Sequence, residues 1–243
     1  MWPTMLLLGL TSSMAHAAEP EAVLPAGLYL LDMTHVSSTK LPLGRTSSAT
    51  RSLLLADLRW EDGRLTQHQT TCAVRITGKP AFVDTTIPGP FLRSIPDTTT
   101  VATVDTSTDD ARYVMDLGVN RAGWRGAPGA ALPTTKDDPR IYDQDGDGAP
   151  GVSVHVDVGI FGEGMVYVVQ QSRAELRGTV DKGIVRGKVT THLLEQLVVG
   201  STKSLFANNP PGLRPEDHKS RFTLSPLPSG TTCATLKPPA DWL

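Results

Sequence analysis

Apolar and polar residues alternate along most of this chain, and no stretch of helical length keeps an apolar period of about 3.6 residues. Alternation at every second residue is typical of strands that bury one face. The clearest example spans residues 174–180 and 184–199, which are separated by the turn Asp-Lys-Gly at 181–183. A second turn signal, Glu-Asp-Gly at 61–63, separates residues 51–60 from residues 64–76. This pattern predicts a β-hairpin, and the chain as a whole predicts an all-β protein.

The remaining alternating segments are short and closely spaced, with no helices between them. A single helical turn is expected within residues 87–96, and the stretch 121–150 is predicted to be irregular. No internal repeat or composition shift is visible, so we expect residues 18–243 to form one domain, a single antiparallel β-barrel or barrel-like sandwich. About ten strands are predicted, drawn from residues 27–33, 51–60, 64–76, 98–105, 112–118, 152–158, 165–171, 174–180, 184–199, 220–224 and 231–236.

The N-terminus has the features of a signal peptide. Residues 5–10 form a short apolar run, and Ala15-His16-Ala17 has the small-x-small form of a cleavage site. We therefore expect residues 1–17 to be removed and the protein to be exported, to the periplasm, the cell surface or the medium. The apolar run is too short to cross a bilayer as a helix, which needs about 20 residues.

The chain contains two cysteines, Cys72 and Cys233. In an exported protein such a pair is expected to form a disulfide; two buried thiols are the alternative. Cys72 lies in the predicted strand 64–76, where strict alternation places Val74 and Ile76 on its face. The same alternation places Gln67, Gln69 and Thr71 on the opposite face.

Three aspartates at alternate positions occur in one tight turn, Asp143, Asp145 and Asp147. Calcium prefers six to eight oxygen ligands, and loops that bind it carry acids at positions 1, 3 and 5. A glycine at position 6 permits the bend, and position 7 contributes its backbone carbonyl. Gly148 and Ala149 occupy those two positions. The alternative is a solvated acidic turn without an ion.

This turn resembles the DxDxDG calcium loops of EF-hands, dockerins and thrombospondin type 3 repeats, over about a dozen residues. The resemblance implies a structural calcium ion. The loop departs from the EF-hand pattern at position 9, which is Gly151, and at position 12, which is Val154 in place of the bidentate Glu. A further ligand must then come from elsewhere, and Asp157 is our first candidate. The others are Asp137, Asp138 and Glu163.

No catalytic signature is present. The chain lacks a GxSxG elbow, an HExxH motif and a phosphate-binding glycine loop. His155 and Asp157 share a strand face, and His68, His155 and His192 lie on predicted strands, but neither set has a supporting spacing for acid–base chemistry or zinc.

Several function classes remain open. We expect a non-enzymatic binding protein that holds a small or extended ligand in a barrel mouth or on a sheet face. A hydrolase of envelope polymers that uses Asp157, Glu163 or Glu195 is the alternative, and two carboxyl groups about 5–10 Å apart in one pocket would favour it. A purely structural surface protein also fits.

Composition weighs against two further partners. The net charge is −2 and no basic block occurs, so no nucleic-acid partner is expected. An outer-membrane-associated barrel is a further alternative, but aromatic residues make up only 5% of the chain and do not form the girdles of such barrels. We therefore expect no membrane insertion.

Overall fold

The computed structural model describes residues 23–41, 44–79, 84–107, 110–207 and 212–242. The predicted signal peptide lies outside these ranges. Within them, antiparallel strands form one continuous sheet, as the sequence predicts, and no helix is long and apolar enough to cross a membrane. The strands are β1 (Gly27–Leu41), β2 (Gly44–Glu61), β3 (Arg64–Lys79), β4 (Asp84–Thr86), β5 (Thr98–Asp105), β6 (Arg112–Ala122), β7 (Val152–Asp157), β8 (Glu163–Asp181), β9 (Ile184–Ser201), β10 (Arg214–Pro215) and β11 (Arg221–Pro226).

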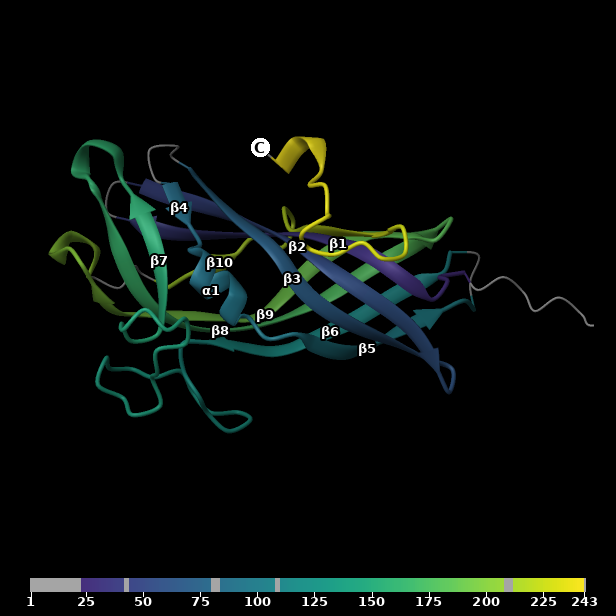
Figure 1. Ribbon diagram of the computed structural model, residues 1–243, viewed down its shortest axis with the longest axis horizontal. Helices are drawn as coiled ribbons and strands as arrows, with labels where there is room; N and C mark the ends of the chain where they lie inside the picture. The colour runs from purple at the N-terminus through teal and green to yellow at the C-terminus, as the bar shows by residue number, and fades with distance from the viewer. Residues whose placement is uncertain (1–22, 42–43, 80–83, 108–109, 208–211, 243) are drawn as a thin grey trace, which may run out of the picture.

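The sheet closes on itself as an irregular barrel (Figure 1). Strand pairing runs from β1 through β2, β3, β5, β6, β8, β9 and β11 and back to β1. β3 and β8 are long enough to serve both ends of the barrel. At one end β5 and β6 bridge them, and at the other end β4 and β7 do so. The short helix α1 (Gly89–Ser94) lies between these two bridges.

The two hairpin turns predicted from the sequence are confirmed. β2 and β3 are joined by Asp62-Gly63, and β8 and β9 by Lys182-Gly183. All four residues have positive φ, between 49° and 75°. Two-residue turns with this geometry match the right-handed twist of the strands they connect, which explains the preference for glycine at the second position.

Several strand boundaries differ from the predicted ones. β1 and β2 extend well beyond residues 27–33 and 51–60, and the predicted strands 165–171 and 174–180 are parts of the single strand β8. The predicted strand at residues 231–236 is wrong. There, the backbone N–H groups of Thr232 and Thr235 each donate to the other residue's hydroxyl, which closes a turn in place of a strand ladder.

The end of the barrel bridged by β5 and β6 is filled with side chains. Tyr113 is fully buried in this core, with its ring 6.0 Å from that of Phe222 and its hydroxyl donating to Gln67 at 2.9 Å. The pKa of Tyr113 is raised because burial disfavours the phenolate. The apolar members of this core come from all eight ring strands, so the core ties that end of the barrel together.

A β-bulge in β3 changes which of its side chains point inward. Leu53 pairs with Ala73 and Leu54 with Thr71, so Cys72 has no partner on β2. Before the bulge Gln69 and Thr71 face the interior, and after it Val74 and Ile76 do. The strict alternation predicted for this strand is therefore wrong, since the extra residue reverses the pleat.

Cys72 and Cys233 form a disulfide, with Cα atoms 5.0 Å apart. The bond attaches the C-terminal segment to the outside of β3. The segment ends in η3 (Ala240–Trp242), where the Trp242 carbonyl accepts a hydrogen bond from Arg75 and the Trp242 ring lies 5.5 Å from the Arg51 guanidinium. These contacts place the segment, the yellow end of the chain in Figure 1, against the outer side of β2 and β3. A disulfide is consistent with an oxidising, exported location.

Candidate functional site

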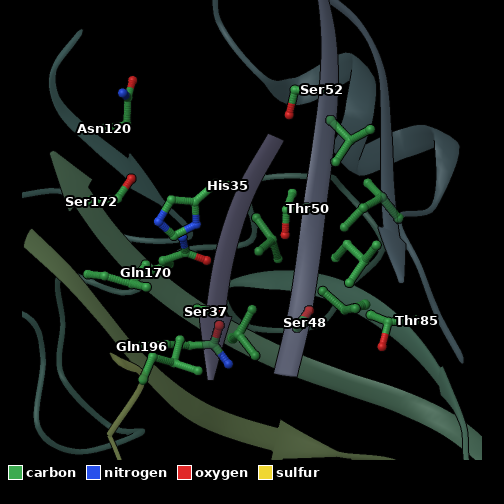
Figure 2. A pocket seen from close by; sticks show the side chains of 18 of the residues that line it. His35, Ser37, Ser48, Thr50, Ser52, Thr85, Asn120, Gln170, Ser172 and Gln196 are labelled. Atoms are coloured by element: carbon green, nitrogen blue, oxygen red, sulfur yellow. The ribbon is translucent and has the colours of Figure 1, made fainter. Parts of the chain in front are cut away.

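The end of the barrel bridged by β4 and β7 encloses a cavity of about 470 Å³ (Figure 2). This volume lies in the usual range for small-molecule sites, roughly 300–1,000 Å³. Its wall combines valines, such as Val154 and Val168, with hydroxyl and amide side chains, such as Thr50 and Gln170. No Asp, Glu, Lys or Arg is among the described lining residues, so the cavity is lined without formal charge.

His35 is the one titratable side chain in this lining. Its Nε2 lies 2.7 Å from the hydroxyl of Thr191, on the neighbouring wall. Burial lowers the pKa of His35, because the charged ring loses hydration, and the carboxylate of Asp217 opposes that effect in part. The ring is therefore neutral at pH 7 and can donate or accept one hydrogen bond to a ligand.

This pKa shift predicts a pH dependence of stability. The folded pKa of His35 is below the unfolded value of about 6.5, so the unfolded chain takes up the proton first as the pH falls. We expect the free energy of unfolding to decrease as the pH drops through about 6.5 toward the folded pKa. Urea titrations of the parent and of His35→Gln between about pH 7.5 and pH 5.5, about one unit on each side of that value, measure the difference. His68→Gln, at an exposed histidine, is the control, and identical slopes for the parent and His35→Gln would contradict the assignment.

A second space of about 470 Å³ adjoins the first beneath α1. Phe91 of α1, Asn120 and Gln170 line both spaces, so the two are neighbouring parts of one interior. Gln144, in the aspartate turn, also lines this second space, and its side-chain nitrogen lies 3.3 Å from the carbonyl oxygen of Ser94 at the end of α1. The aspartate turn therefore contacts α1, the helix that lies between the β5–β6 bridge and the β4–β7 bridge.

The aspartate turn brings three carboxylates together, as the sequence predicts. Asp143, Asp145 and Asp147 each place an oxygen within 4.8 Å of the others, close enough to hold a metal ion together. The turn is closed at its base because the Gln144 N–H donates to the Gly151 carbonyl and the Gly151 N–H to Tyr142, both at 3.0 Å. No other such group of His, Cys, Asp and Glu occurs in the described ranges.

Backbone hydrogen bonds fix these carboxylates in place. Asp143 accepts the N–H groups of Gly146 and Gly148, at 2.7 and 2.8 Å, and these bonds lower its pKa. Asp145 accepts the N–H of Ser153 at 2.9 Å, and Asp147 accepts the hydroxyl of the same serine. Ser153, which follows the turn, therefore holds two of the three aspartates, and the sequence pattern did not indicate this role.

Asp145 is the carboxylate whose environment best fits a cation. Its Oδ1 is enclosed, and no donor of the described chain reaches it. Burial raises the pKa of Asp145, and the charges of Asp147 and Asp143 raise it further. A buried, unpaired carboxylate oxygen beside two other carboxylates is unfavourable alone and is stabilised by a bound cation.

Two departures from the EF-hand pattern have structural reasons. Gly151 has φ of 88°, and a Cβ there would lie 2.5 Å from the Val168 carbonyl oxygen, so the position cannot carry a ligand side chain. Val154 faces the barrel cavity and is turned away from the carboxylates. The packing of this turn against β8 therefore excludes the usual ligands at positions 9 and 12.

The structure does not place the predicted additional ligands beside the three aspartates. Asp157 is the last residue of β7, so about five residues of extended chain separate it from Val152 at the turn. It is the cross-strand partner of Glu163 on β8. Asp138 is engaged by Arg140, which lowers its pKa to about 2, and Asp137 is exposed. Asp157 lies away from the three aspartates because β7, which follows the turn, carries it to the opposite end of the strand.

The carboxylates considered for hydrolysis also lie outside the cavity lining. Glu163 is exposed and its side chain lies 3.1 Å from Nε2 of His155, while Glu195 accepts a hydrogen bond from Gln171. His68 pairs with Asp97 at 3.5 Å. The predicted polar strand face of His155 and Asp157 is thus a surface feature, and the described histidines do not converge.

A ligand site in a barrel mouth was expected from the sequence, but the residues that line this cavity were not predicted. Its hydroxyl-rich part comes from the segments of β1 and β2 that the alternation pattern missed, which include Ser37, Ser48 and Thr50. The available signal was the hydroxyl side chain at every second position of residues 48–52, Ser48, Thr50 and Ser52.

Comparisons of the chain with models of known families, with curated proteins and with solved structures find no match.

Proposed function

We propose that the protein is an exported, non-enzymatic binding protein that holds a small, uncharged and largely apolar ligand inside the barrel. The observation that carries this proposal is the cavity of about 470 Å³, whose described lining has a single titratable side chain, His35; Arg121 lines only the adjoining second space. A charged ligand would lose its hydration there without a countercharge, which is costly, while an apolar one gains by leaving water. Glycoside hydrolysis by the usual acid–base mechanism needs two carboxyl groups at the reacting bond, and the described lining offers none.

The fluorescent apolar amine N-phenyl-1-naphthylamine, neutral at pH 7, tests the proposal. We expect the mature, oxidised protein to bind it with a rise in fluorescence, and Val154→Trp, which places an indole in the cavity, to weaken binding by about tenfold or more. His155→Trp, on the outer face of the same strand, is the matched control and should bind like the parent.

If Val154→Trp does not fold, Thr50→Phe fills the cavity from β2 and is tested in its place. Absence of binding by the parent, or equal binding by Val154→Trp and His155→Trp, would refute the proposed function.

We further propose that the ion held by Asp143, Asp145 and Asp147 is calcium and that its role is structural. The donors are all carboxylate oxygens, which suit a hard cation, and the flanking structure is a strand and an irregular segment without a movable pair of helices. A bound ion would neutralise the turn that supports α1 through Gln144, and so would support the cavity wall.

A further inference from the structure

The order of strands around the cavity determines which walls face each other. From β2 the wall runs through β1, β10, β9, β8, β7, β4 and β3 and returns to β2; all these neighbours are paired except β10 and β9, which are only in contact. In a ring of eight, strands four places apart are opposite. β1 therefore faces β7, and β9 faces β3.

One half of this wall carries hydrogen-bonding side chains. His35 and Thr50 are cross-strand partners on β1 and β2, and Ser37 and Ser48 form the next pair. Figure 2 shows these four side chains together with Ser52 on the two neighbouring strands. The hydroxyls of Ser48, Thr50 and Ser52 make no hydrogen bond to another described residue, so they remain available to a ligand. β9 continues this side with Thr191 and Gln196.

The opposite half is almost entirely hydrocarbon. β7 contributes Val152, Val154 and Val156, and β3 contributes Val74 and Ile76. Ile87 and Phe91, from the segment that includes α1, extend this surface.

The division between the two halves is incomplete. Thr85 on β4 is polar on the apolar side, and the polar side includes four apolar residues, Met33 on β1, Val189 and Leu194 on β9, and Leu213. β8 forms the boundary, since its valines lie beside β7 while Gln170 and Ser172 lie further along the strand. The cavity thus has a polar wall and an apolar wall that face each other.

Each wall rejects a different kind of ligand. A molecule that is polar all round would press hydroxyl or carbonyl groups against valines without partners, and a pure hydrocarbon would leave the hydroxyls of β2 without partners. We infer that the ligand is facially amphiphilic, an uncharged molecule with hydrogen-bonding groups along one face and hydrocarbon along the other. This inference rests on the proposed function and specifies the chemical class of its ligand.

Two steroid esters with the same carbon skeleton separate the contributions of the two walls. Methyl cholate carries its hydroxyls on one face of the ring system, and methyl cholanate carries none. Each is titrated against the mature protein that holds N-phenyl-1-naphthylamine, and displacement of the dye is followed by its fluorescence. We expect methyl cholate to bind about tenfold more tightly, because several hydroxyls gain partners on the polar wall.

A matched pair of variants assigns that preference to the polar wall. Thr50→Val removes one hydroxyl from the cavity without changing the shape of the side chain, and Thr103→Val makes the same change on the outer face of β5. Thr50→Val should weaken methyl cholate by about three- to tenfold and leave methyl cholanate unchanged. Thr103→Val should change neither.

The outcomes distinguish this inference from the proposed function. If the dye binds but the two esters displace it equally, or neither displaces it, the facial inference is overturned and the proposed function stands. The same holds if Thr50→Val weakens both esters alike. If the dye itself does not bind, the proposed function fails and the inference fails with it.

Discussion

Calcium is expected to raise the melting temperature of the mature, oxidised protein, and Asp145→Ala is expected to abolish that rise. At a calcium concentration about a hundred times the dissociation constant, a site present only in the folded state adds about 2.7 kcal/mol. For a chain of this size that corresponds to roughly 5–10 °C. The reason is the enclosed Oδ1 of Asp145, which has no donor and lies beside two other carboxylates. Thermal melts in EGTA and across a calcium titration, with magnesium in parallel, measure the effect.

Three variants make this result specific. Asp145→Asn keeps an acceptor for the Ser153 N–H but removes the charge, so it should melt like the parent in EGTA and gain little from calcium. Asp137→Ala, at an exposed aspartate outside the group, should keep the full gain. Asp157→Ala should also keep it, because the structure places this residue at the far end of β7. Equal melting of Asp145→Ala and the parent with and without calcium would refute the site.

Removal of the disulfide is expected to produce the largest loss of stability. Cys72 and Cys233 are 161 residues apart, and closing so long a loop in the unfolded chain corresponds to at most about 5 kcal/mol, with measured values commonly between about 2 and 5. Urea titration of the Cys72→Ser/Cys233→Ser double variant against the oxidised parent measures this loss.

The control for the disulfide prediction uses the same two proteins under reducing conditions. Reductant should lower the urea midpoint of the parent to that of the double variant and leave the double variant unchanged. Limited proteolysis should show faster cleavage of the C-terminal segment in the double variant, because the contacts of Trp242 with Arg51 and Arg75 would then hold it alone. A parent whose midpoint is the same oxidised and reduced would contradict the prediction.

Much of the fold was accessible from local sequence signals. The hairpin turns at Asp62-Gly63 and Lys182-Gly183 were predicted because two-residue turns with positive φ favour glycine strongly. The helical turn within residues 87–96 and the strand that begins at Val152 were also predicted correctly. These features depend on residues that are neighbours in the sequence, so no knowledge of distant contacts was required.

The errors occur where distant contacts decide the outcome. The bulge at Cys72 turns Gln69 and Thr71 inward before it and Val74 and Ile76 inward after it, which alternation within one strand cannot show. Residues 231–236 alternate like a strand but have no partner strand, and the disulfide and the Thr232–Thr235 turn decide their structure. The far position of Asp157 follows from the pairing of β7 with β8 along its whole length.

The sequence by itself determined the all-β class, the cysteine pair and the clustering of three aspartates in one turn. Each of these depends on residue type and close spacing, which act locally in the chain. Only the tertiary structure decided the cavity. Residues 46–52 are rich in Ser and Thr and resemble a turn region when read alone, because a strand facing a cavity has no need of an apolar face. Closure of the barrel places that polar segment opposite the valines of β8, more than a hundred residues away in the chain.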